Sequence, residues 1–325
     1  MSLYRTGLPQ LEGQPFLTDG GIETSLIFHD GFDLPDFAAF HLLKDERGAT
    51  ALERYFERYA DLARRFGTGL ILESPTWRAS ADWGDRLGYS RAGLAGANRA
   101  SIRMLEQLRN GMQHGEPVVI SGCVGPRGDG YVATNVMSAA EAETYHREQI
   151  EVFAATEADM VSAITMNYSA EAIGIARAAR RFTLPVAVAF TVETDGKLPT
   201  GQPLGEAIDE VEQATAGYVS YFMLNCAHPS HFAGILAKGE PWTARIRGLR
   251  ANASHKSHAE LNGSVELDIG NPDELAYAYA SLRRGPLRNL NVLGGCCGTD
   301  ERHIERIARE CVPLIARRMP AARSV

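Results

Sequence analysis

The sequence lacks long apolar runs, basic clusters and low-complexity segments, and each absence excludes a class of protein. No run approaches the roughly 18 apolar residues of a membrane-spanning helix. The 40 Asp and Glu residues outnumber the 33 Lys and Arg, and a net charge of −7 argues against a nucleic-acid-binding surface. The first residues, MSLYRTGLPQ, show no secretion signal. We expect a soluble, cytoplasmic protein whose partners are small molecules, with no nucleic acid or membrane; whether it forms a homo-oligomer is left open.

Cysteine is scarce, and its positions are informative. The chain has 5 cysteines, at positions 123, 226, 296, 297 and 311. An odd number without a secretion signal does not suggest a disulfide framework. Cys296 and Cys297 are adjacent and follow Gly294 and Gly295. The pair is either two buried apolar residues beside a turn, or a functional pair where glycines allow close approach of the backbone.

Short apolar runs alternate with longer amphipathic segments about eight times, which is typical of parallel βαβ units. The predicted strands are Phe16–Thr18, Gly69–Glu73, Pro117–Ser121, Met160–Thr165, Val186–Thr191, Tyr218–Asn225, Arg245–Ala251 and Leu290–Gly294. The predicted helices lie near 50–66, 91–112, 139–156, 170–181, 205–216, 231–237, 272–283 and 300–317. The pattern predicts an α/β fold, a single-domain (β/α)8 TIM barrel over 1–325 with its core at about 14–318. A doubly wound open sheet is the alternative, but no G-x-G-x-x-G opens the first helix.

Three cysteines fall at the ends of two predicted strands. Cys226 follows the sixth strand, and Cys296 and Cys297 follow the eighth. The active sites of such barrels are built at the carboxyl ends of the strands. Three thiolates can hold zinc in a tetrahedral site with one open position, which is typical of catalytic zinc. The spacing of the cysteines alone is weakly specific, so the flanking residues decide.

The flanking motifs resemble the homocysteine S-methyltransferase family. They are Thr18–Thr24 (TDGGIET), Asn225–Pro229 (NCAHP) and Gly294–Thr299 (GGCCGT), and the resemblance runs from about residue 14 to 310. It implies a (β/α)8 barrel, a zinc ion held by Cys226, Cys296 and Cys297, and a role for Asp19 and Gly20 in holding the amino-acid end of homocysteine. The implied reaction moves a methyl group from a small sulfonium or quaternary ammonium donor to homocysteine, giving methionine. The resemblance does not identify the methyl donor.

One position departs from the family pattern. Relatives end strand 4 with a Glu-Thr pair whose carboxylate contacts the substrate ammonium, and here Ile164 stands where that Glu is expected. An unpaired buried ammonium is costly. Either another carboxylate replaces it, with Glu73 the first candidate and Glu193 the second, or the enzyme methylates or demethylates a different small thiol. A non-catalytic zinc-binding or redox-sensing barrel is the alternative of another class.

Several neighbouring residues have two interpretations each. His228 is either a further ligand or a hydrogen-bonded loop residue. Asn225 is a predicted substrate-binding residue that either orients the adjacent ligand loop or has a structural role in bonding the backbone. Cys123 is expected in a turn after the third strand, and Cys311 is expected to pack inside the last helix. The aromatic residues Trp77, Trp83 and Tyr89 either cover the barrel mouth or hold a methylated cation by cation–π attraction.

Overall fold

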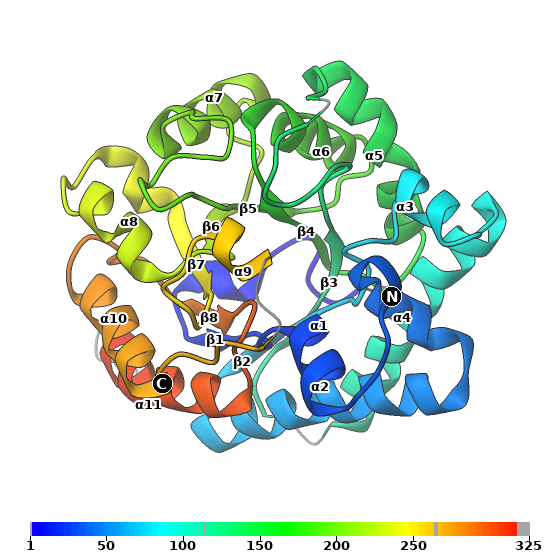
Figure 1. The fold of residues 1–325 in the computed structure, drawn as a ribbon, viewed down its shortest axis with the longest axis horizontal. Helices are drawn as coiled ribbons and strands as arrows, with labels where there is room; N and C mark the ends of the chain where they lie inside the picture. Colours follow the sequence, from blue (N-terminus) through cyan, green and yellow to red (C-terminus); the bar gives the residue numbers. More distant parts are fainter. Residues whose placement is uncertain (1, 113–114, 135, 263–265, 317–325) are drawn as a thin grey trace, which may run out of the picture.

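The chain folds into a closed barrel of parallel strands surrounded by helices (Figure 1). The computed structural model describes residues 2–112, 115–134, 136–262 and 266–316. Each strand pairs in parallel with its sequence neighbours, and β8 closes the barrel against β1. The strands are β1 (Phe16–Leu17), β2 (Gly69–Glu73), β3 (Val118–Val124), β4 (Met160–Met166), β5 (Val186–Phe190), β6 (Tyr221–Asn225), β7 (Ile246–Ala251) and β8 (Val292–Gly295). The predicted (β/α)8 barrel is confirmed.

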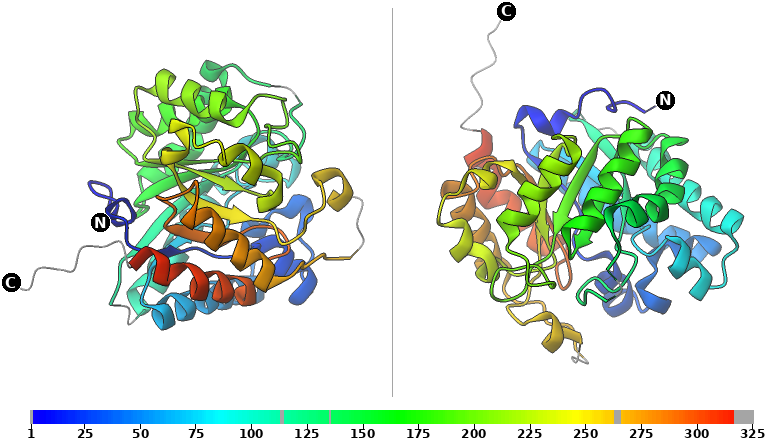
Figure 2. Two further views of the ribbon diagram at one scale, coloured as in Figure 1. Left: turned by 90° about the vertical axis from the view of Figure 1, so that its left-hand side faces the viewer. Right: turned by 90° about the horizontal axis from the view of Figure 1, so that it is seen from above.

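The longer helices form the outer ring around the strands (Figure 1), and two further views show them on the outside of the sheet (Figure 2). They are α2 (Glu46–Phe66), α4 (Arg91–Gly111), α5 (Ala139–Ala154), α6 (Ser169–Arg181), α7 (Leu204–Thr215), α8 (Pro229–Leu236), α10 (Pro272–Arg284) and α11 (Glu301–Ala316). The shorter helices are α1 (Ile22–Thr24), α3 (Ala81–Arg86), α9 (His258–Asn262), η1 (Pro9–Glu12), η2 (Ser25–His29), η3 (Pro35–Phe37), η4 (Ala39–Lys44) and η5 (Pro241–Arg245). Of these short helices, α1, η2, η3 and α9 contribute residues to the cavity described below.

Local sequence explains why the ring helices form. In α2, Leu52, Tyr55, Phe56 and Tyr59 are buried at three- and four-residue intervals, so one face packs on the barrel. A capping box formed by Ser138 and Glu141 begins α5. Inside the barrel, a separate apolar cluster fills the space between the strands. Within the described residues, no helix has the length and apolar character needed to cross a membrane.

Several boundaries differ from the prediction, and three of the differences lie on elements next to the cysteines or on the helix after Cys226. Strand β3 extends to Val124, so Cys123 lies inside this strand and not in a turn after it. Strand β6 begins at Tyr221, three residues after the predicted start. Helix α8 begins at Pro229, where the fixed φ of proline suits the first helical position. Residues 317 and 318, at the predicted ends of the last helix and of the core, lie outside the described residues.

Candidate metal and substrate site

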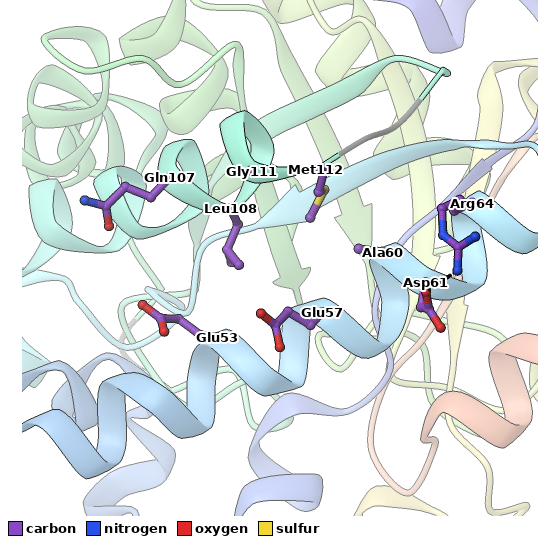
Figure 3. A pocket seen from close by; sticks show the side chains of 9 residues that line it. All are labelled: Glu53, Glu57, Ala60, Asp61, Arg64, Gln107, Leu108, Gly111 and Met112. Atoms are coloured by element: carbon purple, nitrogen blue, oxygen red, sulfur yellow. Dashed lines mark hydrogen bonds and ion pairs between the residues drawn. The ribbon is translucent and has the colours of Figure 1, made fainter.

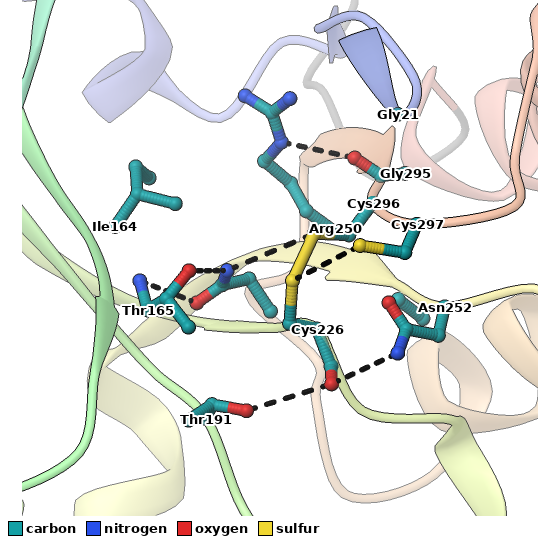
Figure 4. Close-up of a disulfide and its surroundings, with 12 residues drawn as sticks. Gly21, Ile164, Thr165, Thr191, Cys226, Arg250, Asn252, Gly295, Cys296 and Cys297 are labelled. Carbon is teal, nitrogen blue, oxygen red and sulfur yellow. Dashed lines mark hydrogen bonds between the residues drawn. A yellow bond between two sulfur atoms is a disulfide. The ribbon is translucent and has the colours of Figure 1, made fainter. Parts of the chain in front are cut away.

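The three cysteines from two strand ends meet at the carboxyl end of the barrel (Figure 4). The sulfur atoms of Cys226, Cys296 and Cys297 all lie within 4.8 Å of one another. Cys226 and Cys296 are joined by a disulfide, and the Cys297 sulfur lies 4.0 Å from that of Cys226. The sequence did not predict this disulfide, because its members are 70 residues apart and both were expected as metal ligands.

The donor set of this cluster fits a zinc ion. A tetrahedral zinc with Zn–S bonds of about 2.3 Å holds its sulfur ligands about 3.8 Å apart. The distance between the Cys226 and Cys297 sulfurs, 4.0 Å, is close to that value. Thiolates are the metal-binding form of cysteine, so the disulfide must be reduced before all three sulfurs can bind an ion. Three sulfur ligands would leave one of four tetrahedral positions open.

The backbone at Cys226 is held in an unusual conformation. Its φ is 53°, in the left-handed region that non-glycine residues seldom adopt. The Asn252 amide donates to the Cys226 carbonyl (3.0 Å), and His258 Nε2 lies 2.6 Å from the same oxygen. The Thr191 hydroxyl is a third, longer donor at 3.5 Å. Such surrounding bonds are what maintain strained backbone at functional sites.

Glycines before the adjacent Cys296 and Cys297 allow close packing. A Cβ on Gly294 would overlap the side chain of Thr18, and one on Gly295 would overlap Thr299. Gly298 turns the chain after the cysteines with a φ of 79°. The Tyr131 hydroxyl covers the cluster, 3.5 Å from the Cys226 sulfur and 3.4 Å from that of Cys297. The GGCCGT motif therefore has a steric basis.

A cavity of about 370 Å³ lies over the cysteines. The predicted site residues that line it are Asp19, Gly20, Glu73, Cys226, Cys296 and Cys297. Asn225 is not among the lining residues. Its amide instead connects β6 to β4, because Oδ1 accepts from the Thr165 backbone N–H (3.0 Å) and Nδ2 donates to the Thr165 hydroxyl (2.8 Å). This geometry favours an orienting role for Asn225.

The two predicted acidic contacts are held by the barrel itself. Arg250 of β7 donates to Asp19 Oδ1 at 2.6 Å, and the Tyr55 hydroxyl donates to Oδ2 at 3.0 Å. Burial raises the pKa of Asp19, and the charge of Arg250 opposes this rise. Ser162 donates to Glu73 Oε1 at 2.8 Å, while Oε2 is buried without a partner in the described part of the chain. Burial also raises the pKa of Glu73.

The other candidates are placed as follows. Ile164 lies in β4 and lines the cavity, so an apolar side chain does stand at this position. Glu193 is 3.2 Å from His258 Nδ1 and is not a lining residue. His228 caps α8 by accepting from the Ser230 backbone N–H, as a hydrogen-bonded loop residue would. Cys311 is buried inside α11 as expected.

The aromatic cluster contacts cations of the protein itself. The Arg78 guanidinium carbon lies 3.9 Å from the Trp77 ring centroid and 3.8 Å from that of Trp83. Lys44 lies 4.4 Å from the Tyr89 ring. Trp83 Nε1 donates to a backbone carbonyl at 3.3 Å. Trp77 also lines the cavity, whereas Trp83 and Tyr89 do not, so these contacts favour the structural interpretation for Trp83 and Tyr89.

Sequence reasoning missed five residues near the cysteines: Glu23, Arg78, Tyr131, Arg250 and His258. Arg250 carried a signal, since a charged residue within a predicted apolar strand needs a buried partner. The other four lie on short helices and loops, where no periodicity indicates the direction of a side chain.

A second hollow, between α2 and α4, is unrelated to this site (Figure 3). Its lining includes Glu53, Glu57 and Asp61, with Arg64 paired to Asp61 at 2.7 Å. It lies on the helical ring and contains no cysteine or histidine. It does not offer the chemistry of the cavity over the cysteines.

Fold and site together define a (β/α)8 barrel with three clustered cysteines at the catalytic end of the strands. The family model described as Homocysteine S-methyltransferase matches residues 16–311. The chain belongs to this family.

Solved structures with the same fold include homocysteine methyltransferase MmuM from Escherichia coli. Its oxidized form is 19% identical with a TM-score of 0.70, and the match covers 91% of this chain and 95% of MmuM. Its metallated form is 18% identical with a TM-score of 0.69, covering 91% of this chain and 96% of MmuM. A search of the curated proteins gave no match.

Proposed function

We propose that the protein is a zinc-dependent S-methyltransferase that transfers a methyl group from a small sulfonium or quaternary ammonium donor to homocysteine, giving methionine. The observation that carries the proposal is the meeting of three cysteine sulfurs beside a cavity at the carboxyl end of the barrel. Membership of the homocysteine S-methyltransferase family supports it.

The chain's own residues have defined tasks in this proposal. Cys226, Cys296 and Cys297 hold the ion, and Asn252 and His258 fix the Cys226 backbone. Bound zinc supplies a deprotonated, oriented substrate thiol at neutral pH. Asp19, Gly20 and Glu73 line the cavity and stay predicted substrate contacts. Asn225 remains a predicted site residue, and its side chain donates a hydrogen bond to the Thr165 hydroxyl of β4.

The bond changes are simple. The substrate thiol loses its proton, and its sulfur forms a bond to the methyl carbon of the donor. The bond from that carbon to the donor's positive sulfur or nitrogen breaks, and its electron pair leaves with the neutral product. No protein group needs to become covalently modified. The protein's contribution is to hold both reactants in line, which can supply several kcal/mol.

One observation favours a second acceptor. Ile164 cannot pair with an ammonium, and it lines the cavity where the resemblance expects Glu. The alternative is therefore methyl transfer to or from a small thiol without an amino group.

The disulfide between Cys226 and Cys296 is the observation that favours a redox-sensing barrel.

The proposal is tested by product formation. Reduced, zinc-loaded protein is incubated with homocysteine and methyl-deuterated S-methylmethionine, betaine or S-adenosylmethionine, and labelled methionine is measured by mass spectrometry. We expect labelled methionine with one donor and none with Cys297→Ser. Zinc binding without methionine from any donor would contradict the assignment of homocysteine.

A further inference from the structure

Glu23 is an acidic side chain in the cavity without an ion-pair partner among the described residues. It belongs to α1, lines the cavity over the cysteines, and is half-buried. Loss of water around this carboxylate raises the pKa of Glu23 to about 7; Asp19 adds to the rise, and Arg250 and Arg78 oppose it. A carboxylate in such surroundings gains more from a cationic ligand than one in water does.

The position of Glu23 beside the cysteines is fixed by the backbone. The Gly298 N–H donates to the Thr24 hydroxyl at 3.2 Å, and the Gly21 N–H donates to the Thr299 carbonyl at 3.0 Å. These bonds attach both ends of α1 to the turn that follows Cys297. Glu23 therefore belongs to a segment that is hydrogen-bonded directly to the turn after Cys297.

Arg78 is the positively charged counterpart of Glu23 in the same cavity. Its side chain is 95% buried, since the residue retains 5% of its exposure, and it lines the same cavity. Its Nη1 donates to the Gly128 carbonyl at 3.0 Å, and the rings of Trp77 and Trp83 fix its plane. Its Nε is buried without a partner in the described part of the chain. Burial lowers the pKa of Arg78 to about 10, and Asp129 is the charge that opposes this most strongly, although no ion pair within 4.0 Å joins the two side chains in the described residues.

The other acidic side chains that line the cavity have hydrogen-bond or ion-pair partners in the protein. Ser162 donates to Glu73 Oε1, and Asp129 Oδ1 accepts from the backbone N–H groups of Tyr131 and Val132. Asp19 forms an ion pair with Arg250, and the same guanidinium opposes the rise in the pKa of Glu73. Asp268 is 3.4 Å from Lys256. Glu23 differs from these neighbours because, among the described residues, its side chain has neither an ion pair nor a hydrogen bond from another residue. Arg78 likewise forms no ion pair within the described residues.

We propose that Glu23 and Arg78 hold the α-amino-acid head of the thiol substrate, Glu23 contacting its ammonium group and Arg78 its carboxylate. The guanidinium geometry suits a carboxylate, and charge-assisted hydrogen bonds are the strong class. This assignment places the residue that contacts the substrate ammonium on α1. The resemblance expects that residue on β4, at the position where Ile164 stands. It rests on the proposed function, because it takes homocysteine as the acceptor.

Dissociation constants for three thiols test the assignment. L-Homocysteine carries both groups, 4-mercaptobutyrate lacks the ammonium, and 3-mercaptopropylamine lacks the carboxylate. Calorimetry on reduced, zinc-loaded protein should show that Glu23→Gln raises the dissociation constant of homocysteine about 10- to 100-fold and leaves that of 4-mercaptobutyrate unchanged. Arg78→Gln should weaken homocysteine by a similar factor and leave 3-mercaptopropylamine unchanged, with Arg78→Lys restoring part of the affinity.

Matched variants separate the charges from general damage. Arg86 also stacks on Trp83, 4.6 Å from the ring, but does not line the cavity, so Arg86→Gln should leave all three constants unchanged. Glu53→Gln on α2 is the acidic control, and Glu73→Gln should not weaken homocysteine more than 4-mercaptobutyrate. Thermal melts report whether each variant is folded.

Three outcomes overturn the assignment. Equal weakening of homocysteine and 4-mercaptobutyrate by Glu23→Gln removes Glu23 as the ammonium partner. A loss of ammonium selectivity in Glu73→Gln and not in Glu23→Gln transfers that role to Glu73. An Arg78→Gln variant that binds all three thiols normally but has a raised KM for the methyl donor assigns the carboxylate to the donor. Failure of the proposed function is distinguishable, since the unaltered zinc-loaded protein would then not bind homocysteine.

Discussion

Buried carboxylates at the two ends of the barrel have different surroundings. At the amino end, both oxygens of Asp159 are used: Oδ1 accepts from the backbone of Leu3 and Tyr4, and Oδ2 accepts from Arg109 and the Ile120 backbone. At the carboxyl end, Glu73 keeps a buried oxygen without a partner in the described residues, and Glu23 lacks an ion pair there.

The difference separates stability from function. A buried charge is stable when its hydrogen-bonding capacity is satisfied by the protein. Asp159 meets that condition, so it joins the N-terminal segment to β3 and β4 and has nothing left for a ligand. Glu73 and Glu23 retain hydrogen-bonding capacity in the cavity, where a substrate can enter. Four substitutions test this separation of function from stability, in decreasing order of expected effect.

Replacing a cysteine of the cluster should abolish activity. Cys297→Ser removes one of three sulfur donors, and we expect less than about 1% of the methyl transfer, because even the partners that orient metal ligands are worth 10- to 100-fold. Zinc content by atomic emission should fall in parallel, while the far-UV circular dichroism spectrum stays unchanged. Full activity in zinc-depleted Cys297→Ser would contradict a metal role.

Replacing Asp159, whose two carboxylate oxygens are both hydrogen-bonded, should affect stability. Asp159→Asn leaves Arg109 buried without its counterion, and breaking such a pair costs about 3–5 kcal/mol. Urea denaturation should report this loss, and the activity of the folded fraction should stay within about twofold. The contrast between the two ends fails if the variant is fully stable but inactive.

Removing the hydroxyl over the sulfurs should have a moderate effect. Tyr131→Phe deletes the group that lies 3.5 Å and 3.4 Å from two cysteine sulfurs. We expect zinc affinity, measured by competition with a chelator, to fall about tenfold. An unchanged affinity would show that Tyr131 only covers the cavity.

The smallest effect is expected where α11 begins. Asp300 accepts from the Arg302 backbone N–H at 3.0 Å, and Asp300→Ala should cost about 1 kcal/mol. Burial opposes the lowering of the Asp300 pKa, but His303 and Arg302 hold it below its usual value. A depressed pKa contributes stability that is complete above the ordinary Asp range and is lost as the pH falls through the folded value.

The pH dependence supplies the check on Asp300. Urea titrations at several pH values should show the difference between Asp300→Ala and the unaltered protein narrowing below about pH 4. A difference that is constant from pH 7 to pH 3 would mean that the Asp300 charge does not contribute.

The fold and the cysteine cluster could be predicted because their signals are local. Apolar runs and amphipathic periods mark each strand and helix, and Cys226, Cys296 and Cys297 follow predicted strand ends. Which acidic groups of the cavity are ion-paired could not be predicted, because Arg250 neutralises Asp19 although the two residues are 231 positions apart in the sequence. Which carboxylate remains unpaired depends on such distant contacts, so Glu23, on a helix of three residues, gave no signal.

X-ray absorption at the zinc edge, on reduced protein with and without homocysteine, tests the central claim most directly. The account predicts one zinc bound to three sulfur atoms from the protein, with a fourth sulfur added when homocysteine binds. A zinc whose ligand shell is unchanged by homocysteine would contradict homocysteine as the acceptor. A reduced protein that binds no zinc would contradict the zinc-dependent reaction itself.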